Sequence, residues 1–298
     1  MPGSLAIAAV QAAPRAIGAD LGPFVDDVAR HAAVGARLVA YPELHLFGSE
    51  LHPVEERNDV LRASAIGLDA PIVAELAAAA ADAGVWLVPG TVCERGAGGE
   101  LFNTALVFSP DGRLAATYRK VFPWRPTEPY DPGDRFVVVD VDGVRLGIDV
   151  CYDAWFPEVT RHLAWMGSEV VLNLVKTTTP DREQEVVLAR ANAIVNQVFM
   201  ISVNCAGPIG RGRSIVVDPE GGILDESADA GETALDLELD VDHVHRTRER
   251  GTAGVSRMWD PFRPGDAPIR LPLYDGRIDP ATWSPSAVRI PPDREGQP

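Results

Sequence analysis

Three side chains with complementary chemistry, Glu43, Lys120 and Cys151, each stand just after a stretch that predicts a β-strand. Catalytic groups gather at the carboxyl ends of strands, so residues far apart in the chain can meet there. A carboxylate can take a thiol proton, a thiolate can attack a carbonyl carbon, and an ammonium can stabilise the resulting oxyanion. The three residues therefore indicate nucleophilic acyl chemistry. The stretches that precede them are Leu38–Tyr41, Leu114–Tyr118 and Val144–Val150.

The segment around Cys151 predicts a sharp turn from a strand into a helix. Val144–Val150 alternates as a half-buried strand does. Pro157 then opens a helical pattern, at a position where the missing N–H of proline has no cost. Such a turn exposes the thiol and leaves free backbone N–H groups beside it, as a nucleophile and its oxyanion require. Taken singly, a cysteine is more often a small buried apolar residue, which is the prediction for Cys93 and Cys205.

The composition excludes several classes of partner. The chain has 298 residues, 46% of them hydrophobic, and a net charge of −16. This acidic balance argues against binding to nucleic acid or to anionic membrane surfaces. No apolar run approaches the length of a membrane span, and the N-terminal residues resemble a first strand rather than a signal segment. Three widely separated cysteines imply no disulfide framework and favour a reducing, cytoplasmic setting.

The rest of the chain alternates between predicted helices and strands, which indicates a layered α/β fold with mixed sheets. Helices are predicted at Pro23–Ala36, Pro71–Gly84, from Pro157 onward, and at Asp181–Val195. Further strands are predicted at Leu5–Val10, Val85–Val92, Asn103–Phe108, Phe136–Asp140, Val170–Leu174, Val198–Val203, Ser214–Val217 and Ala234–Leu239. The turn Pro110-Asp111-Gly112 predicts a hairpin between its flanking strands.

No break in composition marks a linker, so residues 1–258 are predicted to form one domain. The tail from 259 to 298 is rich in Pro, Asp and Arg and has no periodicity. We interpret it as an extended arm that packs on the domain or on a partner subunit.

Several motifs together resemble the nitrilase superfamily of carbon–nitrogen hydrolases, over roughly residues 5–240. The three at the predicted strand ends occur in the family's order, and two more follow them. The motifs are YPE (41–43), YRK (118–120), CYDAWFPE (151–158), ARANAIVNQ (189–197) and RSIVVDPEG (213–221). The resemblance implies a four-layer αββα sandwich with two mixed β-sheets and a Glu–Lys–Cys triad. It implies no metal or organic cofactor.

Carried over residue by residue, the resemblance assigns Glu43 as general base and Cys151 as nucleophile. Lys120 and the backbone N–H of Tyr152 would hold the oxyanion, and a thioester acyl-enzyme would form and then react with water. Glu128 stands where the family has a second glutamate, which positions the substrate nitrogen or the lysine. Family members commonly assemble as homodimers or larger homo-oligomers.

The activity predicted from the resemblance is a cysteine-dependent amidase that converts a small carboxamide into a carboxylic acid and ammonia. The segment Pro123–Glu128 resembles the aliphatic-amidase and formamidase branch, and Tyr152-Asp153 replaces the Trp-Glu that true nitrilases usually carry. The CYDAWFPE turn also resembles enzymes that hydrolyse N-carbamoyl amines, which is the main alternative. A nitrilase, an acyltransferase and a catalytically silent binding homologue are less favoured.

Substrate contacts are expected from loops around the nucleophile. The predicted contact residues are Tyr152, Asp153, Trp155, Trp124 and Lys176. Arg211 and Arg213 lie in a short loop, where they would either bind a substrate carboxylate or pair with acidic surface groups. His243 and His245 lack a third ligand and are not predicted to bind a metal.

Overall fold

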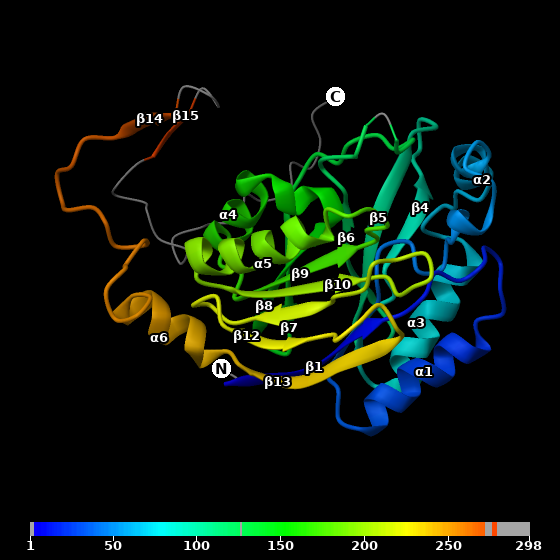
Figure 1. Ribbon diagram of the computed structural model, residues 1–298, viewed down its shortest axis with the longest axis horizontal. Coiled ribbons are helices and arrows are strands. Elements are labelled where there is room, and N and C mark those ends of the chain that lie inside the picture. The colour runs from blue at the N-terminus through cyan, green and yellow to red at the C-terminus, as the bar shows by residue number, and fades with distance from the viewer. Residues whose placement is uncertain (1–2, 126, 272–275, 279–298) are drawn as a thin grey trace.

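The computed structural model describes residues 3–125, 127–271 and 276–278. Two β-sheets pack face to face, and helices cover both outer faces (Figure 1). This arrangement is the four-layer αββα sandwich that the sequence predicts.

The first sheet contains seven strands, and two helices cover its outer face. Its strand order is β13-β1-β2-β3-β5-β4, with β6 beside β5, and both parallel and antiparallel pairs occur. The strands are β1 (Ser4–Gln11), β2 (Leu38–Ala40), β3 (Trp86–Val88), β4 (Thr91–Arg95), β5 (Leu101–Phe108), β6 (Leu114–Arg119) and β13 (Thr233–Asp240). The helices are α1 (Gly22–Ala33) and α3 (Pro71–Ala83).

The second sheet contains six strands in the order β12-β11-β10-β9-β8-β7, and it is also mixed. Its strands are β7 (Val137–Val141), β8 (Val144–Val150), β9 (Val170–Val175), β10 (Phe199–Asn204), β11 (Ile215–Val217) and β12 (Ile223–Glu226). The helices α4 (Pro157–Trp165) and α5 (Arg182–Asn196) pack on its outer face.

The alternation of side chains along the strands divides the core into layers. In β8, Leu146, Ile148 and Val150 point into the apolar layer between the sheets. The intervening Asp149 therefore lies on the opposite side of β8, in line with the period of two along a strand. Apolar burial between the sheets fixes the register of β8, and this register places Cys151 at the end of the strand.

The strand predicted at Val85–Val92 is wrong as a single element, because Pro89-Gly90 divides it into β3 and β4. Gly90 has a φ of 94°, which favours glycine. A Cβ at Gly90 would lie 2.0 Å from the backbone oxygen of Pro42. The close approach of Gly90 to Pro42 holds the loop that carries Glu43 in place.

Gly90→Ala is expected to lower the free energy of unfolding by roughly 2–4 kcal/mol, because it adds overpacking to backbone strain. Gly99 provides a matched control, since its φ is 93° and a Cβ there would meet nothing within 4 Å. Gly99→Ala should therefore cost only about 1 kcal/mol. Urea unfolding of both variants measures the difference. Equal losses would show that the contact with Pro42 contributes nothing to stability.

Other elements carry weaker local signals and are absent from the sequence predictions. The 3₁₀ helix η2 occupies the turn directly after β8, and α6 follows β13. These elements are η1 (Ser49–Leu51), α2 (Arg57–Ala63), η2 (Cys151–Trp155), β12 and α6 (Asp242–Arg250).

The chain beyond α6 begins as part of the domain and then leaves it. Trp259 is buried and contacts Trp165, with ring centroids 6.2 Å apart. The following segment runs outward to the hairpin of β14 (Ile269–Leu271) and β15 (Gly276–Ile278) (Figure 1). Residues 272–275 and 279–298 lie outside the described residues. The domain boundary after 258 stays a prediction.

Candidate active site

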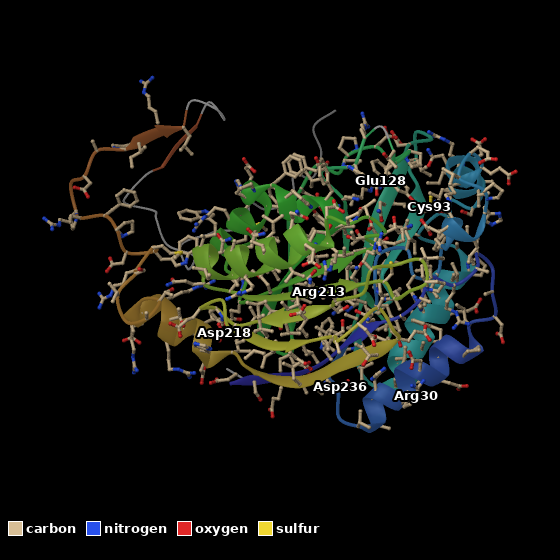
Figure 2. The ribbon with its side chains drawn as sticks, viewed as in Figure 1. Arg30, Cys93, Glu128, Arg213, Asp218 and Asp236 are labelled. Carbon is tan, nitrogen blue, oxygen red and sulfur yellow. The ribbon has the colours of Figure 1, made fainter. Side chains whose placement is uncertain are left out.

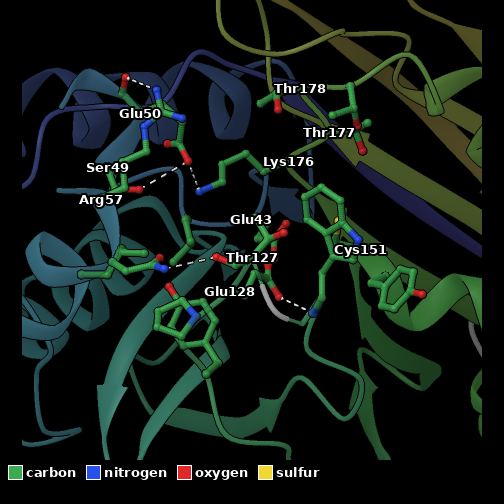
Figure 3. A pocket seen from close by; sticks show the side chains of 18 of the residues that line it. Glu43, Ser49, Glu50, Arg57, Thr127, Glu128, Cys151, Lys176, Thr177 and Thr178 are labelled. Carbon is green, nitrogen blue, oxygen red and sulfur yellow. Dashed lines mark hydrogen bonds and ion pairs between the residues drawn. The ribbon is translucent and has the colours of Figure 1, made fainter. Parts of the chain in front are cut away.

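The ends of β2, β6 and β8 bring Glu43, Lys120 and Cys151 together. Glu43 and Cys151 line one cavity of about 160 Å³, and Glu128 lines it as well. Lys120 lies beside them, with its Nζ 3.2 Å from Oε1 of Glu43. Figure 3 shows the labelled Glu43, Glu128 and Cys151 around the same space. The residues that the strand ends predict therefore meet in the folded chain.

Lys120 is a buried cation held between two carboxylates. Its Nζ lies 2.8 Å from each carboxylate oxygen of Glu128, in addition to its contact with Glu43. Burial by itself lowers the pKa of Lys120, but the charges of Glu43 and Glu128 outweigh it and hold that pKa well above its usual value. Lys120 is consequently an ammonium at neutral pH.

Glu43 is 1% exposed and is fixed by a second donor. Nδ2 of Asn103 donates to Oε1 of Glu43 at 2.7 Å. Asn103 lies near the start of β5 and is absent from the predicted site residues. Its signal is a polar residue in a fully buried strand, since such a residue needs an internal partner. Asn103 and Lys120 together leave Oε2 of Glu43 without a partner among the described residues.

Glu128 belongs to the irregular segment after β6 and closes this side of the site. Its Oε2 accepts a hydrogen bond from the backbone N–H of Trp124 at 2.7 Å. Both of its oxygens also contact Lys120. Glu128 thus connects the backbone at Trp124 to the ammonium group of Lys120.

Cys151 begins η2 directly after β8 in a sharp left-handed turn. Its φ is 50°, which is uncommon for a residue with a Cβ and marks a strained position. Burial and the charge of Glu43 raise the pKa of the thiol well above its usual value, against the opposing effect of Lys120. The resting sulfur is therefore a neutral thiol, and a base must remove its proton before it can attack.

Comparison with known proteins shows which family this chain belongs to. A family model described as carbon-nitrogen hydrolase matches residues 6–249. The chain belongs to the carbon-nitrogen hydrolase family. A formamidase of Pseudomonas syringae pv. tomato is 30% identical over 227 residues, which are 74% of this chain and 64% of that protein. A Bacillus cereus formamidase is 39% identical over 112 residues, which are 37% of this chain and 34% of that protein.

Solved structures with the same fold come from the nitrilase superfamily. Saccharomyces cerevisiae Nit3, a member of branch 10 of that superfamily, superposes with a TM-score of 0.74 at 26% identity, covering 83% of this chain and 94% of that one. An amidase from Nesterenkonia sp. AN1 superposes with a TM-score of 0.68 at 27% identity, covering 84% and 96%. In that amidase, the acetamide moiety of fluoroacetamide is covalently added at the active site cysteine.

Four of the five predicted substrate-contact residues line the cavity. They are Trp124, Tyr152, Trp155 and Lys176. Nζ of Lys176 lies 2.7 Å from Oε1 of Glu50, so its charge is already paired (Figure 3).

Asp153, the fifth predicted substrate-contact residue, does not line the cavity. It is fully buried. Its Oδ2 accepts hydrogen bonds from the hydroxyl of Tyr118 and the backbone N–H of Val150, and its Oδ1 accepts one from the N–H of Phe122. Burial raises the pKa of Asp153 to about 6, although these hydrogen bonds and the charge of Lys120 oppose the rise. We assign Asp153 to holding the nucleophile turn rather than to contacting substrate.

Arg211 and Arg213 are also absent from the cavity lining. The guanidinium of Arg213 pairs with Glu183 and Glu226, and Figure 2 shows Arg213 apart from Glu128. Nε of Arg211 donates to the backbone oxygen of Thr178 at 3.1 Å. The alternative in which they pair with acidic groups therefore describes Arg213, whereas Arg211 contacts a backbone oxygen.

The two histidines that invite a metal interpretation contact carboxylates separately. His243 lies 3.1 Å from Glu220, and His245 lies 2.7 Å from Glu169. Across the described residues, no three His, Cys, Asp or Glu side chains are grouped so as to hold a metal ion. Within the same part of the chain, no helix is long and apolar enough to span a membrane.

Proposed function

We propose that this chain is a cysteine-dependent amidase that hydrolyses a small carboxamide to a carboxylic acid and ammonia. The observation that carries the proposal is the position of Lys120, which contacts both Glu43 and Glu128, two residues that line the same cavity as Cys151. Glu43 provides a base, Cys151 a nucleophile, and Lys120 a cation that can stabilise an oxyanion. The formamidase and amidase names of the relatives support the same reaction class.

The reaction begins with a proton transfer from the Cys151 thiol to Glu43, because the thiol is neutral at rest. The thiolate then attacks the amide carbon, and the oxyanion receives hydrogen bonds from Lys120 and the N–H of Tyr152. Collapse of the tetrahedral intermediate breaks the C–N bond, and Glu43 returns the proton so that ammonia leaves. Water next attacks the thioester while Glu43 takes its proton, and the acid departs as the proton returns to the sulfur.

Glu128 acts by orienting Lys120 and the loop above the substrate. Glu128→Gln is expected to lower kcat by about 10²-fold, the scale of losing a positioned polar group. A glutamine side chain offers only one oxygen, whereas both oxygens of Glu128 contact Lys120. Steady-state kinetics on a small amide measure the effect. A change confined to KM would limit Glu128 to substrate binding.

The structure offers less support for an N-carbamoyl amino acid as substrate, because the guanidinium of Arg213 is already paired. Ammonia release from formamide, acetamide, propionamide, butyramide and N-carbamoylglycine tests the proposed class. The amidase function predicts release from the carboxamides. Release from N-carbamoylglycine alone would replace this function with the carbamoylase.

We further propose that the protein works as a homo-oligomer in a reducing, cytoplasmic setting. Three unpaired cysteines, two of them buried, suit such a setting. Val187 and Val195 lie on α5 with side chains 65% and 43% exposed, and a second subunit would cover them. Light scattering behind size-exclusion chromatography measures the mass, and a monomer at micromolar concentration would contradict the oligomer.

A further inference from the structure

Glu185 presents a carboxylate to the cavity that the amidase reaction does not use. It lies in the first turns of α5, lines the same cavity as Cys151, and is 7% exposed. Its Oε2 accepts hydrogen bonds from Oγ1 of Thr177 at 2.6 Å and from Nη1 of Arg182 at 3.0 Å. Its Oε1 has no hydrogen-bond partner among the residues that the structure describes. An unpaired carboxylate oxygen on a cavity-lining residue can accept a hydrogen bond from a donor that a ligand supplies.

Arg182 holds Glu185 in place and does not itself enter the cavity. Its side chain is fully buried and is not among the lining residues. Its remaining N–H groups donate to Oγ of Ser202 and to the backbone oxygens of Gly212 and Arg213. The guanidinium is thus fixed on the side of Glu185 away from the ligand space.

The charges around the nucleophile leave an excess of one negative charge. Five carboxylates and two cations line the cavity, and Lys120 and Arg182 beside it bring the cations to four. The carboxylates are Glu43, Glu50, Glu128, Asp181 and Glu185, and the lining cations are Arg57 and Lys176. Glu43, Glu128 and Glu185 also contribute to the raised pKa of the Cys151 thiol. A cationic ligand would balance this charge and would ease formation of the thiolate.

We propose that Glu185 selects the acyl group, so that the substrates are small carboxamides carrying an ammonium group beyond the carbonyl carbon. An N–H of this ammonium donates to Oε1 of Glu185 while the carbonyl carbon faces Cys151. The cavity of about 160 Å³ accommodates substrates of this size. This inference rests on the amidase function proposed above.

Three amides of equal heavy-atom count separate the contributions of charge, hydrogen bonding and size. They are propionamide, glycolamide and glycinamide, which differ only in a methyl, hydroxyl or ammonium group. At pH 6.5 the amine is charged, because an α-amino group titrates near 7.7–8.0. A charge-assisted hydrogen bond in a desolvated site predicts a kcat/KM about 10- to 100-fold higher for glycinamide than for propionamide.

Glu185→Gln is expected to reduce this glycinamide-to-propionamide ratio by about tenfold or more. Glutamine keeps the volume and one acceptor but loses the charge that the ammonium requires. Glu183→Gln is the matched control, because Glu183 lies on the same helix, is 70% exposed and pairs with Arg213. It should change the ratio by less than about twofold. Thermal unfolding checks that both variants are folded.

The outcomes also separate this inference from the function on which it rests. Equal kcat/KM values for the three amides in the wild-type protein would overturn the ammonium selectivity and leave the amidase intact. Glycolamide as efficient as glycinamide would likewise overturn it, in favour of a neutral donor. An unchanged ratio in folded Glu185→Gln would remove Glu185 from selection. Absence of hydrolysis of every amide would overturn both the inference and the amidase function. If Glu185→Gln does not fold, the wild-type ratio alone decides.

Discussion

Cys151→Ala is expected to fold and to lose more than about 10⁴-fold in the rate of ammonia release, since no other group can form the acyl-enzyme. Cys151 begins the turn after β8 beside Glu43 and Lys120, where its thiol lines the cavity. Initial rates with a small amide, measured at equal concentrations of folded protein, test this directly.

Cys93→Ala and Cys205→Ala serve as controls because both thiols are buried apart from the cavity lining. Burial raises the pKa of each to about 12, so neither supplies a thiolate at neutral pH. Each variant should retain wild-type kcat within a few-fold. A Cys93 or Cys205 variant as inactive as Cys151→Ala, yet folded, would contradict the assignment of a single nucleophile.

Glu43→Gln is expected to lower kcat/KM by about 10²- to 10⁴-fold, the range of a lost general base. Glutamine can keep the hydrogen bonds from Asn103 and Lys120 through its oxygen, so the site should stay assembled. It cannot take the proton that the raised thiol pKa leaves on Cys151. Steady-state kinetics with circular dichroism as a folding control provide the measurement. A loss below tenfold would assign the proton transfer to another group.

The catalytic constellation could be predicted from the sequence because each member carries a local signal. Glu43, Lys120 and Cys151 are reactive residue types at the ends of apolar stretches, and the layered α/β pattern predicts that such ends converge. Most of the strands follow from the same periodicity, whereas the two-sheet sandwich follows from the resemblance to the nitrilase superfamily. The exception is Pro89-Gly90, a dipeptide typical of turns, which interrupts the apolar pattern from Val85 to Val92.

Other parts of the surroundings of the site could not be predicted, since they depend on contacts between distant segments. Asp153 adjoins the nucleophile in sequence, which suggests a substrate contact, yet Tyr118 and Phe122 occupy its oxygens. Glu183 and Glu185 look alike at the start of a helix, where acidic residues are ordinarily solvated. Only the packing of α5 on its sheet buries Glu185 beside the cavity and leaves Glu183 exposed.

The mechanism depends on a thioester between the acyl group and Cys151. Rapid-quench intact-mass spectrometry of the wild-type protein during turnover of a small amide tests for this thioester most directly. The proposed mechanism predicts an added mass equal to the acyl group, mapped by peptide digestion to Cys151 and absent from Cys151→Ala. An adduct on another residue, or undiminished turnover by Cys151→Ala, would contradict it.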